Sequence, residues 1–231
     1  MRERVEGQFG FWTAVLTAIV TALTFITAIL TPPKGGPFCT EGCIGYPYTD
    51  FAAYIPRDFL WMYPALLVAP LFVVLVADIH ERTAPQRQRF SRVALAFGLI
   101  AATVLTADYF IQLRFVQPAV LKGELEGLAP LTQYNPHGVF IALEEAGYVV
   151  MAAAFLFAGL ALSTEHRLAR ALRVIFVGGF AIVAASFVAF SAWYGHDVEY
   201  RFEVMAISID WSVLIVAGTL LAVAYRRRVG L

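Results

Sequence analysis

The sequence predicts an all-α membrane protein built as a polytopic bundle of six transmembrane helices. The chain has 231 residues, of which 60% are hydrophobic, and its mean hydropathy is +0.71. Soluble domains are about 45–50% apolar, and the excess here lies in long apolar runs. Each run approaches the roughly 20 residues that cross the hydrocarbon core as a helix, in which the backbone satisfies its own hydrogen bonds. The formal net charge is zero, so nothing indicates a nucleic-acid partner.

The apolar runs define six predicted spans. These are Phe11–Leu30, Leu60–Ala77, Val93–Leu113, Val139–Leu162, Val174–Tyr194 and Val204–Tyr225. The first run is longer than the apolar core of a typical signal peptide, and no small-residue cleavage site follows it, so we expect a retained helix. The segments between the runs are too short for a separate soluble domain. Residues 1–231 are therefore expected to form one integral membrane domain.

The basic residues predict that both termini face the cytoplasm, because cytoplasmic loops carry an excess of Lys and Arg. With the N-terminus inside, the cytoplasmic side holds Arg2, Arg4, Arg82, Arg87, Arg89, Arg92, Arg167, Arg170, Arg173, Arg226, Arg227 and Arg228. The outer side keeps only Lys34, Arg57, Arg114, Lys122 and Arg201. The long first loop, residues 31–59, is then extracytoplasmic.

A second outer segment is predicted between the third and fourth spans, from Arg114 to Gly138. Within it, Asn135 followed by Pro136 is typical of a helix N-cap and first helical position. This pair predicts where the fourth helix begins.

Four carboxyl side chains fall inside the predicted spans at similar depth. Asp108, Glu144, Glu145 and Asp210 each lie six or seven residues from the outer end of their helix, which is roughly 9 Å below the outer boundary. A charged residue inside a membrane helix costs about 2.5–3.5 kcal/mol on insertion scales and is a functional candidate. Three helices are thus expected to bring acids to one level. The alternative is that these acids are protonated or paired and purely structural.

Neighbours at helical spacing extend this acidic layer into a predicted outward-facing polar pocket. Gln112 follows Asp108 by four residues, and Tyr148 follows Glu144 by four, so each shares a helix face with its acid. His137 precedes Glu144 by seven residues, and Trp193 ends the fifth span near the same level. The predicted ligand-binding residues are Asp108, Gln112, His137, Glu144, Glu145, Tyr148, Trp193 and Asp210.

A metal site was considered at this level because imidazole and carboxylate groups are metal ligands. The sequence has no HExxH motif, no Glu-x-x-His motif and no clustered pair of histidines. We therefore predict no metal site. No nucleotide-binding, haem-binding or retinal-binding pattern is present, and any cofactor stays unassigned.

The two cysteines, Cys39 and Cys43, lie in the first outer loop. An oxidising exterior favours a disulfide between them, and the small ring that it closes would stabilise only the local loop. A thiol-redox pair is the alternative, although its spacing differs from the usual Cys-x-x-Cys.

Two helix faces are predicted to pack closely. Six threonines share one face of the first span: Thr13, Thr17, Thr21, Thr24, Thr27 and Thr31. Threonines bond back to their own helix or across to a neighbour, so we expect a packing seam. Small residues on the face of Asp210, including Ala217 and Gly218, would also permit close approach.

The segment Ala107–Tyr148 resembles a block in uncharacterised multi-pass membrane proteins of bacteria. The resemblance rests on the strings ADYFIQL, QPAVLKGE and LTQYNPHGVFIALEEAGY. It is consistent with a bacterial inner (cytoplasmic) membrane, and it implies no activity.

Three function classes remain open from the sequence. The leading one is a protein that binds or transports a small cationic or polar ligand, or protons, in the outer acidic pocket. The second is a membrane enzyme that uses one buried carboxyl group as general acid and another as base on a lipid or isoprenoid-like substrate. The third is an accessory subunit of a membrane complex. The lipid bilayer is the one partner expected in every case, and the sequence predicts no oligomeric state.

Overall fold

The computed structural model describes residues 2–227, and side chains from residue 7 onward. Within this range the protein is all-α, without strands. The helices are α1 (Arg2–Ile29), α2 (Met62–Arg82), α3 (Gln88–Ile111), α4 (Gln117–Lys122), α5 (Val139–Ala161), α6 (Arg167–Tyr194) and α7 (Tyr200–Arg227). Arg228 and the side chains of Arg2 and Arg4, which the charge argument counts, lie outside the described part.

Six stretches of helix in this range are long and apolar enough to cross a membrane, as predicted. They fit an integral membrane protein. Five of them correspond to α1, α2, α5, α6 and α7. The sixth, Pro85–Lys122, joins α3 and α4 into 38 residues of continuous helix.

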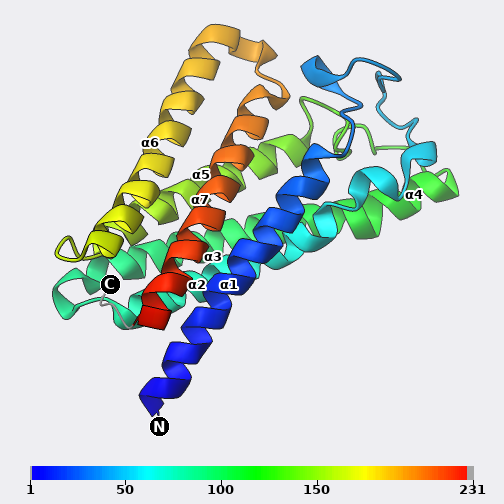
Figure 1. Ribbon diagram of the computed structural model, residues 1–231. Helices are drawn as coiled ribbons and strands as arrows, with labels where there is room; N and C mark the ends of the chain where they lie inside the picture. The colour runs from blue at the N-terminus through cyan, green and yellow to red at the C-terminus, as the bar shows by residue number, and fades with distance from the viewer. Residues whose placement is uncertain (1, 228–231) are drawn as a thin grey trace.

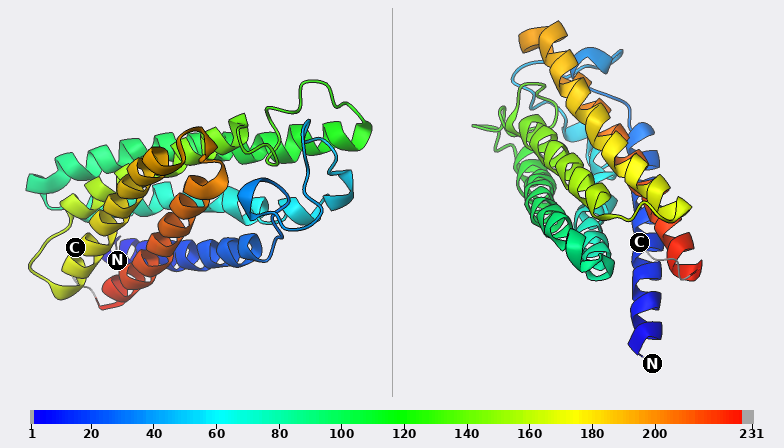
Figure 2. Two further views of the ribbon diagram at one scale, coloured as in Figure 1. Left: turned by 90° about the horizontal axis from the view of Figure 1, so that it is seen from above. Right: turned by 90° about the vertical axis from the view of Figure 1, so that its left-hand side faces the viewer.

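The helices pack as a ring in the order α1, α2, α3, α5, α6, α7 and back to α1, with α7 also touching α5 across the ring. Figure 1 shows α1, α7 and α6 crossing in front of α2, α3 and α5, and Figure 2 shows the same two layers from the side. Both described ends of the chain lie at one end of the bundle. Residues brought together inside the ring therefore come from segments far apart in the sequence.

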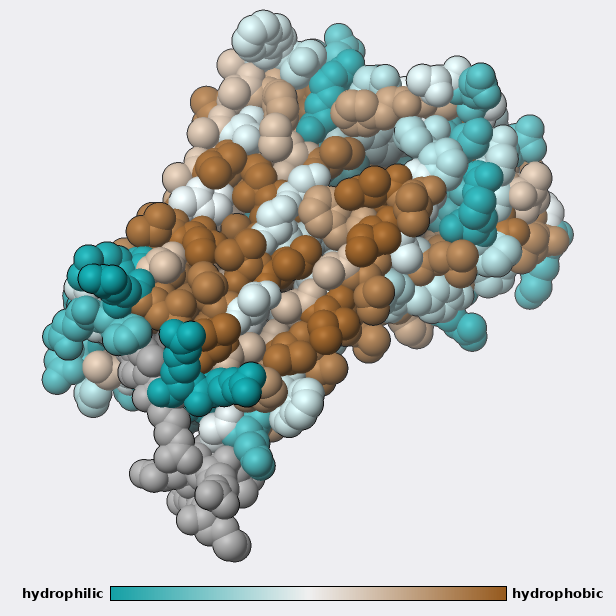
Figure 3. Space-filling model, viewed as in Figure 1, coloured by the Kyte–Doolittle hydropathy of each residue, from teal (hydrophilic) through white to brown (hydrophobic). Residues whose placement is uncertain are grey.

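The two ends of the bundle differ in character. One end, here called the loop end, carries the segments 30–61 and 123–138 and the turn 195–199. The opposite end, here called the arginine end, carries the turns 83–87 and 162–166. Between the two polar ends, Figure 3 shows a broad belt of apolar side chains, as expected for a surface in contact with lipid.

The first helix shows how this belt arises. Its large apolar side chains point outward at helical spacing: Trp12, Leu16, Ile19, Leu23 and Ile26 are exposed. Its threonines point inward, and Thr13, Thr17, Thr21 and Thr24 are buried. The Thr17 and Thr24 hydroxyls donate to the carbonyl oxygens of Thr13 and Val20, each at 2.8 Å. The predicted threonine packing seam is thus confirmed.

The predicted small-residue face on α7 is also confirmed. Ala217 is fully buried. A Cβ atom at Gly218 would lie 2.8 Å from the carbonyl oxygen of Ala14 and 3.1 Å from the Cβ of Ala18. The backbones of α1 and α7 therefore approach so closely that only glycine fits at this crossing.

The predicted end of the third span at Leu113 is wrong, because the helix continues to Lys122. Gln112–Val116 forms a π-helical segment directly before Pro118. Proline lacks an N–H group and its ring clashes with the carbonyl one turn earlier, and a π-bulge widens the turn that would clash. Gly123, with φ of +75°, then ends α4 in the left-handed conformation. The second loop therefore begins only there.

The predicted N-cap at Asn135 is also wrong. The N-cap of α5 is Gly138, without a side-chain cap. The Asn135 side chain instead accepts from the His137 backbone N–H at 3.0 Å and donates to the Ala129 carbonyl at 2.9 Å. Asn135 therefore forms a turn that precedes the helix. Asparagine is common both in turns and at helix N-caps, because its short side chain places an oxygen where a nearby backbone N–H can donate to it.

Candidate functional site

Four buried carboxyl groups lie in the half of the bundle toward the loop end. Asp108 on α3 is 2% exposed, Glu144 on α5 is 0%, and Glu203 and Asp210 on α7 are 8% and 0%. Three of them were predicted, and Glu203 was not. The described salt bridges engage Asp58, Asp78 and Glu199 instead. Among the described residues, the four buried carboxyls therefore have no basic partner.

Glu144 lies at one end of a hydrogen-bonded chain that continues through two tyrosine hydroxyl groups. The Tyr109 hydroxyl donates to Glu144 Oε1 at 2.7 Å. The hydroxyls of Tyr109 and Tyr148 are 2.8 Å apart, and since Tyr109 gives its proton to Glu144, Tyr148 donates to Tyr109. The predicted grouping of Glu144 with Tyr148 is thus present, but Tyr109 links them.

Glu144 and Glu203 form a carboxyl pair. Glu144 on α5 and Glu203 on α7 lie close enough to act on each other electrostatically. The Oε2 atom of each is buried without a hydrogen-bond partner. An unpaired buried polar atom is costly, so this pair has unused capacity for a proton or a ligand.

Sequence analysis missed Glu203 because the sixth span was predicted to begin one residue later, at Val204. Glu203 was therefore left out of the predicted acidic layer. One signal could have found it: Glu203 precedes Asp210 by seven residues, which places both on one helix face. The helix begins at Tyr200, so Glu203 lies inside its first turn.

Aromatic rings surround the carboxyl pair. The Trp61 ring lies 5.4 Å from Tyr109 and 6.3 Å from Trp211. The Tyr148 ring lies 6.2 Å from Trp211. Trp61 directly precedes α2, and the other three side chains come from α3, α5 and α7; all four are buried. They form what we call the aromatic cage.

A cavity of about 260 Å³ leads from the loop end to this cage, between α1 and α7. Its walls include Phe25, Trp61, Phe140 and Trp211, and Glu203 lines it. Figure 3 shows a hollow in the surface between α1 and α7, where both helices reach the loop end. Lys34 also lines the cavity, but its Nζ donates to the Glu41 carbonyl at 2.8 Å.

The roof of the cavity is an ordered polar network. Asp58 is bound by Arg57 Nε at 2.6 Å and by the Tyr134 hydroxyl at 3.0 Å. Burial, and next the charge of Asp58, raise the pKa of Tyr134 well above its ordinary value, so this hydroxyl stays a donor. The Tyr200 hydroxyl donates to the Gln133 carbonyl at 2.9 Å, which fastens α7 to the second loop.

Gln112 belongs to this framework and not to the acidic cluster. Its Nε2 donates to the Leu131 carbonyl at 2.5 Å, and its Oε1 accepts from the Gln133 backbone N–H at 3.3 Å. The side chain is buried. It anchors the loop that roofs the cavity.

Glu145 and His137 face a different cavity, of about 230 Å³, which His196 and Glu199 also line. Glu145 is adjacent to Glu144 but turned about 100° around the helix, toward α6. Trp193 is 83% exposed and lines neither cavity. The predicted single pocket is thus divided by α5 and α7 into two.

Asp108 and Asp210 are the other two buried carboxyl groups, on α3 and α7. Asp108 lies close enough to Glu144 to act on it electrostatically, whereas Asp210 lies two helical turns beyond Glu203 along α7. Both oxygens of Asp210 and Oδ2 of Asp108 are buried without hydrogen-bond partners.

No group of three or more His, Cys, Asp and Glu side chains in the described residues is arranged to hold a metal ion. His137 and Glu144, which the metal hypothesis combined, belong to different environments. The acidic cluster itself holds carboxyl and phenol groups, without imidazole.

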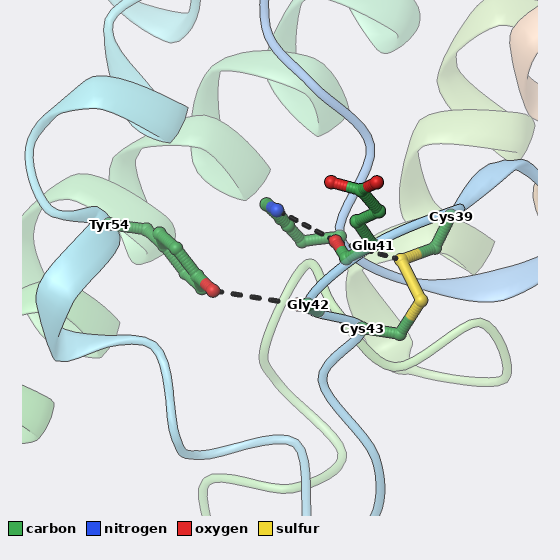
Figure 4. Close-up of a disulfide and its surroundings, with 6 residues drawn as sticks. Cys39, Glu41, Gly42, Cys43 and Tyr54 are labelled. Carbon is green, nitrogen blue, oxygen red and sulfur yellow. Dashed lines mark hydrogen bonds between the residues drawn. A yellow bond between two sulfur atoms is a disulfide. The ribbon is translucent and has the colours of Figure 1, made fainter.

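The cysteines form a disulfide, Cys39–Cys43, in the first loop, in agreement with the predicted pairing. Figure 4 shows the small ring beside Glu41 and Gly42, with the Tyr54 hydroxyl reaching the Gly42 carbonyl at 3.5 Å. The ring lies beside the turn Gly36–Phe38, whose Phe38 lines the cavity. Its position suits a local staple.

Comparison of the chain with protein-family models, with curated proteins and with solved structures finds no match.

Proposed function

We propose that this membrane protein binds a small organic cation, of the alkylammonium class, in the cavity between α1 and α7. The carboxyl pair of Glu203 and Glu144 would balance the positive charge. The observation that carries the proposal is a buried, unpartnered carboxyl oxygen at the wall of an aromatic-lined cavity. Aromatic faces attract such cations, by about 2 kcal/mol or more where water is excluded.

The cavity favours a cation that is partly apolar. Indole and phenyl rings make up much of its wall. A strongly hydrated metal ion would lose its water shell there without enough oxygen ligands in return. An alkylammonium ion loses less hydration and gains contact with the rings.

The proposal also assigns a side of the membrane. The loop end would face outward, with both termini in the cytoplasm, following the excess of arginine at the other end. The cavity would then take its ligand from outside the cell, and the chain would lie in the cytoplasmic membrane.

The direct test is calorimetric binding of tetramethylammonium to the full chain in detergent or nanodiscs, with the neutral tert-butanol as the matched control. We expect binding of the cation alone. Glu203→Gln should weaken it at least about tenfold, because the variant loses the attraction between a carboxylate and a cation, which is about 4 kcal/mol at 4 Å for an effective dielectric constant of 20. Glu199→Gln is the matched control, because Glu199 pairs with Arg201 and lines the other cavity. Equal affinity in both variants would refute the role of Glu203.

A membrane enzyme acting on a lipid is the second candidate, supported by one observation. The cavity wall includes Ile29 and Val204, which are exposed on the side of the bundle. A lipid chain could enter there and bring its polar end to Glu203. Mass spectrometry of lipid incubated with the wild type and with Glu203→Gln distinguishes the two candidates, since only an enzyme changes the mass of the lipid.

A further inference from the structure

The carboxyl pair of Glu144 and Glu203 must be either charged or protonated in the empty site. A carboxylate without a counter-ion is strongly disfavoured in a low-dielectric interior, and such groups neutralise by taking up a proton. Two carboxyls in contact interact further and titrate as one unit. Since no basic side chain in the described part pairs with them, the empty site is expected to be neutral.

The surroundings bring no described cation against the pair. Lys34 lines the cavity and keeps its charge, but its Nζ is turned to the first loop, where it meets the Glu41 carbonyl and the Tyr54 ring. The titratable side chains that face the pair or share its cavity come from every neighbouring element: Asp108 and Tyr109 on α3, Glu145 and Tyr148 on α5, Tyr200 and Asp210 on α7, and Lys34, Asp58 and Tyr134 in the loops. Asp58 is held by Arg57, and Lys34 is held at the Glu41 carbonyl. The remainder are acids and phenols.

We propose that the Glu144–Glu203 pair exchanges one proton for each cation that the cavity binds. This rests on the proposed function and assigns its coupling. The O–H bond of one carboxylic acid breaks, its proton leaves through the cavity to water, and the carboxylate that remains balances the incoming cation. The charge of the site is zero before and after.

The pair is built for this exchange. After one proton leaves, the other carboxyl keeps its proton and can donate it to its neighbour's carboxylate. The Tyr109 hydroxyl already donates to Glu144 Oε1. The negative charge is therefore spread over a hydrogen-bonded unit at the moment that the cation arrives, in a site that needs no rearrangement of helices.

Protons and cations are expected to reach the site from one end of the bundle. Below the cage, toward the arginine end, the ring is filled by apolar side chains that include Phe72, Met151 and Phe155, all buried. Protons and cations are thus expected to enter and leave by the loop-end cavity alone.

The test counts protons. Tetramethylammonium has no proton of its own, so calorimetry in buffers of different ionisation enthalpy measures what the protein releases. We expect about one proton per cation, and an affinity that rises about tenfold per pH unit between pH 6 and 7. Binding without proton release across this range would overturn the exchange and leave the proposed function standing. Absence of binding would sink both.

Variants locate the exchanging group. The double variant Glu144→Gln/Glu203→Gln should lose both binding and proton release, whereas Glu199→Gln should keep both. The single variants Glu144→Gln and Glu203→Gln control for a folding defect in the double variant. Each retains one carboxyl group, which must still release a proton when the cation binds. A double variant that binds the cation and still releases one proton would show that another acid is responsible.

Discussion

At the scale of single residues, the site depends on the hydrogen bonds that tyrosine hydroxyl groups donate. Glu144 is held by the Tyr109 hydroxyl, which is in turn held by Tyr148. A phenol that donates to a carboxylate stabilises charge, and removing it leaves a buried acceptor unpaired. Tyr109 therefore positions and polarises Glu144 without lining the cavity itself.

Tyr109→Phe tests this role. We expect it to weaken tetramethylammonium binding about tenfold, the effect of one hydrogen bond to a charged group, and to move the rise of affinity to higher pH, because the carboxylate form loses a donor. Calorimetry at several pH values measures both effects. Tyr148→Phe, which is one bond further away, should have the smaller effect. The reverse order would contradict the chain of donors described here.

At the scale of helices, the cavity exists because α1 and α7 touch at one end and separate at the other. They pack backbone to backbone where Gly218 meets Ala14. Toward the loop end, side chains as large as Phe25 and Trp211 stand between them. Close contact at the crossing thus holds the walls of the cavity in place.

Gly218→Ala is expected to destabilise this crossing. The added methyl group would lie 2.8 Å from a backbone oxygen, and overpacking of this kind costs about 1–3 kcal/mol. The thermal midpoint of the purified protein should fall by several degrees. Gly178→Ala on α6, where a Cβ meets nothing within 4 Å, is the matched control and should leave the midpoint unchanged. Equal midpoints for both variants would contradict the packing described.

At the scale of the whole molecule, the proposed function requires the loop end to face the outside of the cell. The ring of helices provides a lipid-facing belt and buries a cluster of carboxyl groups, but these features do not tell which end of the bundle faces the cytoplasm. The arginines at one end predict the orientation, because cytoplasmic loops carry an excess of Lys and Arg.

Labelling of single cysteines in intact cells tests the orientation. In a background of Cys39→Ser/Cys43→Ser, Glu126→Cys at the loop end should react with a membrane-impermeant maleimide. Gln86→Cys at the arginine end should react only after the cells are opened. Both positions are exposed, so access to the reagent is the one difference between them. Labelling of Gln86→Cys alone in intact cells would reverse the topology and place the cavity on the cytoplasmic side.

The sequence by itself determined the six apolar helices and the presence of acids within them. Hydropathy acts on each segment separately, so Asp108, Glu144 and Asp210 could be recognised as acids inside helices. Their common depth stays a prediction, because it was counted from a third-span end at Leu113 and the helix continues to Lys122. What the sequence could not supply was the rotation of each helix about its own axis. Prediction therefore combined Glu145 and Trp193 with a pocket that they do not line, and missed Glu203, one residue outside a predicted boundary.

Only the tertiary structure decided which carboxyl groups meet. Helix rotation results from how all the neighbours pack, as at Gly218, where the backbone of α7 fits against that of α1. That packing turned Glu144 inward to Glu203 and Glu145 outward to α6, although the two glutamates are adjacent in the chain. The physical reason is that depth in a membrane is a local property of a segment, whereas contact between helices is a property of the whole bundle.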